Sequence, residues 1–182
     1  MIETTRLHLR PLLENDLNTL VTELNNFNIT RNTARIPYPY TIEDAAAYLA
    51  YGCSLNSQSL GLAITIATEP AKIIGGISYL FSVEKNDAEL GYWLSEAQWG
   101  KGLMSEATTA MVNHAFTVSN IEKLAACYHN DNPVSARILK KLGFEEGAQC
   151  SNFSLAQGKD VAVTNMQLTR EMWHSQQKSR GE

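Results

Sequence analysis

The chain has 182 residues, of which 44% are hydrophobic, 19% charged and 8% aromatic. This length and apolar content predict one globular domain with a sizeable core, and they exclude a disordered, collagen-like or low-complexity protein. Fifteen basic and 19 acidic residues give a formal net charge of −4. That balance argues against nucleic acid as the main partner, because polyanion binding needs a basic face.

The sequence shows no signal for secretion, membrane insertion or metal binding. Polar and charged residues follow the first two positions directly, and apolar runs such as 62–67 have only the length of a strand. We therefore expect a cytoplasmic monomer or homodimer that binds no membrane. Cys53, Cys127 and Cys150 lie far apart, and no Cys or His spacing predicts a metal site or a disulfide framework.

The first 60 residues predict one strand and two helices. Residues 6–11 alternate like a half-buried strand, and apolar residues recur at helical spacing over 13–24. Residues 25–40, rich in Asn and closing with Pro-Tyr-Pro-Tyr, are expected to be irregular. Thr41 has the position of an N-cap for a second helix that ends near Gly52.

Beyond residue 60 the pattern predicts mostly strands. The expected strands are 61–68, 73–82, 88–94 and 124–129, with a final hairpin of 144–155 and 161–168; one helix follows Gly102, and another opens at Asn132-Pro133 and closes at Gly143. A meander followed by a strand–helix–strand segment indicates an α/β (α+β) fold with a mixed sheet. We expect a single domain over 1–175 and a polar, frayed C-terminal tail over 176–182.

The segment most suggestive of chemistry is 89–107, where a strand leads through a Gly-rich loop into a helix. Gly100 and Gly102 allow a tight turn with exposed amides, and the helix N-terminus adds partial positive charge. Such a cradle suits a pyrophosphate. Walker A is excluded because Gly100-Lys101 is followed by glycine, and the dinucleotide motif finds Ser105 at its last glycine position. From the local pattern alone, a surface loop is an equally good interpretation.

Five segments extend this pattern over nearly the whole chain: ETTRLHLRPL, YPYTIEDAAAYL, ELGYWL, WGKGLMSEA and HNDNPVSARILKKLGFEEG. Together they resemble the GNAT superfamily of N-acetyltransferases, and especially its branch of ribosomal-protein N-terminal (alanine/serine) acetyltransferases. The resemblance implies a mostly antiparallel central sheet of about six or seven strands flanked by about four helices. It also implies acetyl-CoA as the acetyl donor and a primary amine as the acceptor.

The same resemblance assigns the cofactor-binding residues. The loop and first helical turn would wrap the coenzyme A pyrophosphate, largely through backbone amides: Gly100, Lys101, Gly102, Leu103, Met104 and Ser105. Tyr92, Trp93 and Leu94 would offer strand backbone to the pantetheine arm, and one of their amides could polarise the thioester carbonyl. Asn132 would bond the pantetheine besides capping its helix. Further candidates for the phosphate charge are Lys101, Arg137, Lys140 and Lys141, although most such side chains belong to solvated helix faces.

Ser135 and Glu89 are the expected catalytic groups. Many relatives carry a Tyr as general acid seven residues after the position of Asn132, but this chain has Leu139 there. Ser135 is then the best available group to protonate or hydrogen-bond the leaving thiolate. Glu89 would act as the base, although an α-amine of pKa about 8 is already partly neutral at pH 7, so water could accept the proton instead.

The implied reaction is direct attack of a neutral amine on the thioester in a ternary complex. Covalent catalysis by Cys127 or Cys150 is the rival mechanism, but each lies in or beside an apolar strand without a neighbouring His, as expected of a core thiol.

Acceptor recognition in this family lies in the segments that correspond to 25–40 and 152–160. The first contains Arg31, Arg35, Tyr38 and Tyr40, and neither has the dense carboxylate cluster that a polyamine would favour. The pattern therefore favours a protein or peptide N-terminus. Two alternatives stay open: N-acetylation of a small amine, amino acid or antibiotic, and a non-catalytic acyl-CoA-binding domain.

Overall fold

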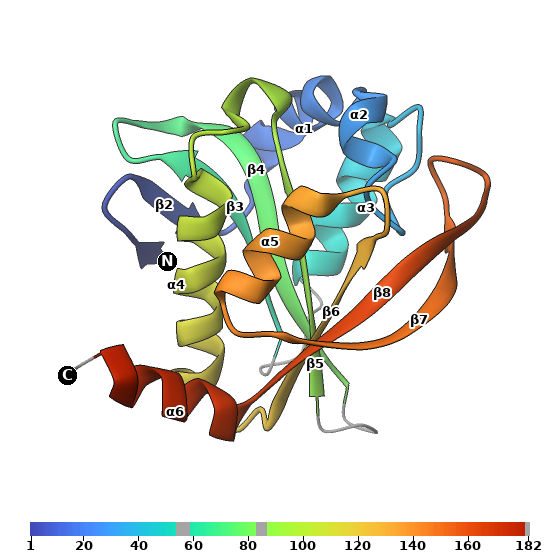
Figure 1. The fold of residues 1–182 in the computed structure, drawn as a ribbon. Coiled ribbons are helices and arrows are strands. Elements are labelled where there is room, and N and C mark those ends of the chain that lie inside the picture. Colours follow the sequence, from blue (N-terminus) through green and yellow to red (C-terminus); the bar gives the residue numbers. More distant parts are fainter. Residues whose placement is uncertain (54–58, 83–86, 181–182) are drawn as a thin grey trace.

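A computed structural model describes residues 1–53, 59–82 and 87–180, and Figure 1 shows their fold. One eight-stranded sheet runs through this part of the chain in the order β1-β2-β3-β4-β5-β6-β8-β7. Neighbouring strands are antiparallel except for β5 and β6, which pair in parallel. The expected α+β class and mixed, mostly antiparallel sheet are confirmed, with more strands and helices than expected.

The strands are β1 (Ile2–Glu3), β2 (Leu7–Arg10), β3 (Leu60–Ile66), β4 (Glu69–Ser82), β5 (Asp87–Leu94), β6 (Lys123–His129), β7 (Glu145–Ser154) and β8 (Lys159–Thr169). The helices are α1 (Leu17–Leu24), α2 (Phe27–Thr30), α3 (Ile42–Cys53), α4 (Leu103–Val118), α5 (Pro133–Lys141) and α6 (Arg170–Arg180), with 3-10 turns η1 (Glu14–Asp16) and η2 (Glu96–Gln98). In the described part of the chain, none of these helices combines the length and apolarity that a membrane crossing needs.

Three elements differ from the expectation, and each has a local cause. β1 has only two residues, too few to show a periodicity. α2 is a single turn within the segment expected to be irregular, and the Asn26 side chain caps it by accepting from the Asn28 amide. The frayed tail expected from residue 176 is wrong as far as residue 180, because α6 continues there. The Trp173 ring anchors this helix against Phe116, with 5.4 Å between centroids.

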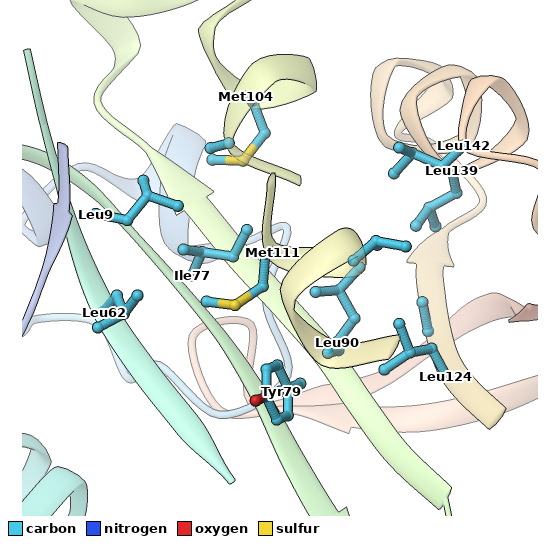
Figure 2. Close-up of a cluster of buried hydrophobic side chains, with 14 of the residues drawn as sticks. Leu9, Leu62, Ile77, Tyr79, Leu90, Met104, Met111, Leu124, Leu139 and Leu142 are labelled. Atoms are coloured by element: carbon cyan, nitrogen blue, oxygen red, sulfur yellow. The ribbon is translucent and has the colours of Figure 1, made fainter. Parts of the chain in front are cut away.

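Each face of the sheet carries its own hydrophobic core. In Figure 1, α4 and α5 cover the front face, whereas α1 and α3 lie behind the sheet. Figure 2 shows the front core, in which Leu139 of α5 and Leu142, just after the helix, approach Leu90 and Leu124 of the sheet. The rear core consists of Leu20, Leu24, Ile29, Tyr40, Ala45, Ala63, Ile73 and Trp93. Because side chains alternate along a strand, Glu89 of β5 lies on the rear face with Trp93.

The helix caps predicted from the sequence are confirmed. The Thr41 hydroxyl accepts from the Asp44 amide at 3.2 Å, and the Asp44 carboxylate accepts from the Thr41 amide at 2.8 Å, which closes a capping box at the start of α3. Asn132 Oδ1 accepts from the Ser135 amide at 3.1 Å, and Pro133 is the first residue of α5. These caps fix where α3 and α5 begin, and therefore what their first turns present.

A buried ion pair holds the start of the first helical layer to the sheet. Arg10 of β2 donates two hydrogen bonds to Asp16, of 2.7 and 2.8 Å, and the Leu13 amide donates a third. The Asp16 side chain is only 4% exposed. Burial alone would raise the pKa of Asp16, but the Arg10 and Leu13 hydrogen bonds lower it below its ordinary value.

We expect Asp16→Asn to lower the free energy of unfolding by about 2–3 kcal/mol at pH 7, because it leaves Arg10 without its charge partner. The measurement is urea unfolding, with Glu14→Gln, an exposed carboxylate of the same turn, as the control. Because the folded-state pKa of Asp16 is lowered, its contribution is complete above the ordinary carboxyl pKa and is lost as the pH falls through the lowered value. Equal destabilisation by both variants would contradict this.

Candidate active site

The sheet opens between its two parallel strands. β5 and β6 pair only through Asp87–Lys123, Ala88–Leu124 and Glu89–Ala125, yet both strands continue. Residues 90–94 stay paired to β4 on the other side, and 126–129 stay paired to β8. The two halves of the sheet therefore diverge from Glu89 onward, and the facing edge of β5 is left for another hydrogen-bonding partner.

Tyr92 and Ser135 meet across this opening. The Tyr92 hydroxyl, from β5, lies 2.8 Å from Ser135 Oγ, in the first turn of α5. The Asn132 cap fixes that turn, so the residues predicted to bind pantetheine and to act as acid lie in one hydrogen-bonded unit. Burial raises the pKa of Tyr92 to about 12, so its phenol stays protonated at neutral pH. The sequence pattern had indicated a role only for the backbone of Tyr92.

The Gly-rich loop leads into α4 without a side-chain cap. Gly100 and Gly102 have φ of 75° and 74°, a left-handed conformation that favours glycine. Gly102 is the N-cap residue and has no side chain to accept from the amides of the first turn. Leu103 and Met104 are buried in the front core, so only their backbone is available to a ligand. An uncapped helix N-terminus after two such glycines fits a bound phosphate.

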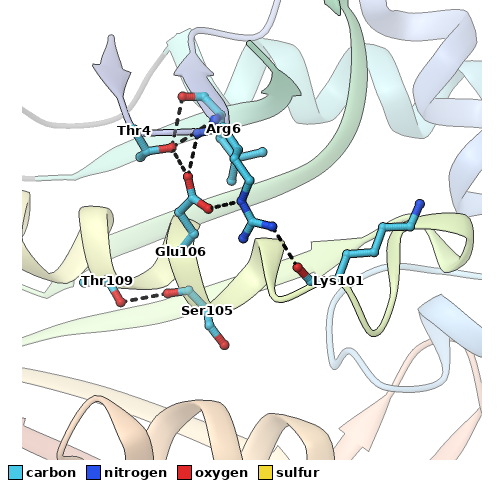
Figure 3. Close-up of polar contacts among 7 residues, drawn as sticks. Thr4, Arg6, Lys101, Ser105, Glu106 and Thr109 are labelled. Atoms are coloured by element: carbon cyan, nitrogen blue, oxygen red, sulfur yellow. Dashed lines mark hydrogen bonds and ion pairs between the residues drawn. The ribbon is translucent and has the colours of Figure 1, made fainter. Parts of the chain in front are cut away.

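A groove with a volume of about 390 Å³ lies between this turn and α5. It is lined by Arg6, Gly102, Ser105, Glu106, Thr109, Ile138, Lys141 and Leu142. Of the cations suggested from sequence, Lys141 lines the groove, whereas Lys140 pairs with Glu146 at 2.9 Å. The Lys101 ammonium donates to Gln98 and extends away from Arg6, as Figure 3 shows.

Arg6 is a residue of this region that the sequence pattern did not indicate. Its Nε donates to Glu106 of α4 at 2.6 Å, and its Nη1 donates to the Lys101 carbonyl at 3.0 Å (Figure 3). The Thr4 hydroxyl donates to the same carboxylate at 2.6 Å. About a hundred residues separate the partners, so no local pattern could have joined them.

The predicted base lies on the opposite side of the opening from the groove. Glu89 is the last residue of β5 that pairs with β6, and its carboxylate accepts a hydrogen bond from Arg35 at 2.6 Å. Arg35 belongs to a segment, residues 31–35, that spans from α2 to the β7–β8 hairpin. At the hairpin, the Leu155 amide donates to the Ala34 carbonyl at 3.0 Å. At the other end of the segment, Arg31 pairs at 2.6 Å with Asp131, between β6 and α5. The two segments predicted to select the acceptor thus bond to each other beside Glu89.

A smaller cavity of about 260 Å³ lies next to Glu89. It is lined by Leu80, Ser82, Asp87, Glu89, Ala125, Ala126, Cys127, Asn152 and Asn165. Burial is the main reason that the pKa of Cys127 is raised, which keeps its thiol protonated and disfavours it as a nucleophile. Cys150 is exposed on β7, so its expected place in the core is wrong. The side chain of Cys53 lies outside the described part.

Two aromatic residues of the acceptor segment have different surroundings. Tyr40 is buried in the rear core, where it supports the fold and cannot stack on a substrate. Tyr38 is 45% exposed and packs against Phe27, with 5.3 Å between ring centroids. Trp93 is likewise buried, so it could contact a cofactor only through its backbone, as expected.

Comparison with known proteins places this geometry in a family. The acetyltransferase (GNAT) domain family matches residues 6–145. The chain belongs to the GNAT acetyltransferases. An uncharacterized N-acetyltransferase, YoaA of Bacillus subtilis (strain 168), is 27% identical over 148 residues, which are 80% of this chain and 83% of the relative. The fold and the enzyme class predicted from the five segments are thereby confirmed.

A further relative and a solved structure of similar fold have names that point to different acceptors. The ribosomal-protein-serine acetyltransferase of Escherichia coli (strain K12) is 32% identical over 74 residues, 40% of this chain and 41% of that protein. The spermidine N-acetyltransferase of Vibrio cholerae, solved with CoA and spermine, superimposes with a TM-score of 0.79 at 19% identity and covers 93% of this chain and 99% of its own. As a GNAT protein this chain is an acetyl-CoA-dependent N-acetyltransferase; neither likeness determines its acceptor.

We expect Gly102→Ala to weaken acetyl-CoA binding by at least about tenfold, because a Cβ at φ 74° forces the loop out of its left-handed conformation. Gly158→Ala is the matched control: Gly158 has φ 62° at the hairpin tip, where an added Cβ would meet open space, and it lies far from the groove in sequence. Titration calorimetry should show weaker binding for the first variant alone. A comparable loss in both would exclude the loop as the phosphate site.

Proposed function

We propose that this enzyme acetylates the N-terminal α-amine of a protein, of ribosomal-protein type, by direct attack of the amine on acetyl-CoA. The acetyltransferase domain is taken to span 1–175. The observation that carries the proposal is the opening between β5 and β6. On one side of it lies the groove beside the Gly-rich loop, which suits a phosphate, and on the other side lies the Glu89 carboxylate. Cofactor and acceptor can then enter from opposite faces of the sheet and meet at Glu89.

The cofactor side follows the assignments made from sequence. The amides of residues 100–105 would hold the pyrophosphate, and the edge of residues 92–94 that faces β6 would pair with the amide groups of pantetheine. Asn132 would contact the same arm. This arrangement would leave the acetyl group beside Glu89 and Ala125, the last paired residues of β5 and β6. A backbone amide there could stabilise the developing oxyanion.

Glu89 would receive the acceptor ammonium and remove its proton. Its present partner, Arg35, is 65% exposed and Glu89 itself 49%, so their ion pair contributes at most about 1 kcal/mol. An incoming ammonium can therefore replace the guanidinium at little cost. The neutral amine then attacks the thioester carbonyl and the C–S bond breaks; the nitrogen gives up its second proton, which the departing thiolate takes up, so that the amide and the CoA thiol form. Water remains the alternative proton acceptor, since an α-amine has a pKa near about 8.

Ser135 would hydrogen-bond or protonate the departing sulfur. It lies one helical turn before Leu139, on the same face of α5, so its hydroxyl replaces the Tyr that many relatives carry at the Leu139 position. Leu139 is fully buried in the front core and has no polar atom to offer. The protonated Tyr92 phenol, 2.8 Å away, can donate a hydrogen bond to the Ser135 oxygen while the Ser135 hydroxyl is directed to the sulfur.

The charges near Glu89 favour a peptide over a polyamine. Three acidic residues around the opening are each paired with a basic one: Glu89 with Arg35, Asp131 with Arg31, and Asp87 with Lys123. A polyamine would favour a dense carboxylate cluster, as argued from the sequence, whereas these three carboxylates are spread over three separate ion pairs. The hairpin also exposes Phe153 and Leu155, at 56% and 50%, which suit contact with peptide side chains.

The test is a panel of acceptors with acetyl-CoA, read by thiol release and by mass spectrometry of the product. Peptides that begin with Ala or Ser should be acetylated at the N-terminus. The same peptides with an acetylated N-terminus and a free Lys are the matched control and should not react. Faster turnover of spermidine or of a free amino acid would support the small-molecule alternative. Tight acetyl-CoA binding without any turnover would support a non-catalytic binding domain.

We expect Ser135→Ala to lower kcat by about a hundredfold while the affinity for acetyl-CoA stays within about twofold, because the hydroxyl acts on the leaving sulfur. Tyr92→Phe should lower kcat less, and the double variant should resemble Ser135→Ala, since the two hydroxyls act as a unit. Steady-state kinetics and calorimetry provide both values. An unchanged kcat in Ser135→Ala would show that Ser135 is not the acid.

A further inference from the structure

Arg6 has three separate contacts at the N-terminus of α4, and one of its nitrogens is still available. Nε and the backbone amide bond to Glu106, and Nη1 bonds to the Lys101 carbonyl. Nη2 has no hydrogen-bond partner within the described residues, and it lies 3.7 Å from the position that a Cβ of Gly102 would take. It therefore stands directly beside the glycine that precedes the free amides of α4.

Arg6 is one of the residues that line the 390 Å³ groove. Ser105 and Thr109 of α4 line the same wall, and Lys141 of α5 contributes a second cation from the opposite side. The groove thus combines uncapped amides with cations on both sides.

Glu106 explains why an arginine is needed at this point. Burial alone would raise the pKa of Glu106, but hydrogen bonds from Thr4 and Arg6 lower it, so the carboxylate is charged at neutral pH. A carboxylate in the first turn of α4 repels a phosphate at the same helix end. Arg6 offsets that charge. Its planar guanidinium can bond the Glu106 carboxylate, the Lys101 carbonyl and a phosphate at the same time, which a lysine ammonium does less well.

We propose that Arg6 is a phosphate-binding residue of the cofactor groove, held in position by Glu106 and the Lys101 carbonyl so that Nη2 contacts a phosphate of coenzyme A. The inference rests on the proposed use of this groove for acetyl-CoA. It adds to the Gly-rich loop a side chain from the β1–β2 connection (Figure 3).

The test compares CoA, 3′-dephospho-CoA and pantetheine in binding to wild-type protein and to Arg6→Gln, by calorimetry or by displacement of a fluorescent CoA. Arg6→Gln should weaken CoA binding by at least about tenfold and leave pantetheine binding within about twofold, because pantetheine has no phosphate. Arg6→Lys should be intermediate. If the loss persists with 3′-dephospho-CoA, the contact is to the diphosphate; if it disappears, the contact is to the 3′-phosphate.

Thr4→Val is the matched control, because it removes a 2.6 Å hydrogen bond to the same Glu106 carboxylate without removing a cation. It should lower the melting temperature of the unliganded protein and leave CoA binding within about twofold. An equal loss of CoA and pantetheine binding in Arg6→Gln, or an equal effect of Thr4→Val, would make Arg6 a structural anchor only. Failure of the wild-type protein to bind CoA would overturn the proposed function itself, whereas unchanged CoA binding in Arg6→Gln would overturn this assignment alone.

Discussion

The limited pairing of β5 with β6 is the constraint on which the site depends. Only three residue pairs join these strands, while β5 is paired along its length to β4 and β6 along its length to β8. Two well-paired half-sheets are thus joined along a short parallel segment and held by separate cores on the two faces. Because the front core packs against both half-sheets, the sheet can leave the β5 edge from residue 90 onward without a strand partner. A buried edge of this kind is costly unless a ligand or side chain satisfies it.

The polar side chains around the opening are arranged as local pairs with little excess charge. On the proposed cofactor side, Arg6 offsets Glu106; on the proposed acceptor side, Arg35 offsets Glu89. The two pairs differ in exposure. The Glu106 side chain is 18% exposed and held by three donors, whereas Glu89 is 49% exposed and has its one ion pair to a more exposed arginine. The first pair suits a permanent scaffold and the second suits exchange with a substrate, because exposed ion pairs contribute little free energy.

The features that depend on neighbouring residues could be predicted from the sequence. The tight turn at Gly100 and Gly102, the Asn132 cap and the final hairpin are confirmed, since each depends on a few consecutive residues. The contacts of Arg6 with Glu106 and of Arg35 with Glu89 could not be predicted, because they join residues 100 and 54 positions apart. Cys150 shows the limit of periodicity: its strand lies at the sheet edge, where an alternating residue need not be covered.

The Tyr92–Ser135 pair shows how tertiary structure adds to the proposed site a contact that the sequence does not reveal. In the sequence of α5 alone, Leu139 stands where many relatives carry the Tyr that acts as acid. Ser135 is a common residue type for a first helical turn, and the sequence does not define the orientation of its hydroxyl. The structure adds a phenol from β5 whose pKa of about 12 makes it a permanent donor at neutral pH. The Asn132 cap accepts from the Ser135 amide, so backbone and hydroxyl are held from different elements. Neither hydroxyl is acidic enough to give up its proton alone, so in the proposed reaction the pair would hold a hydrogen bond toward the sulfur while the proton lost by the amine moves to the thiolate.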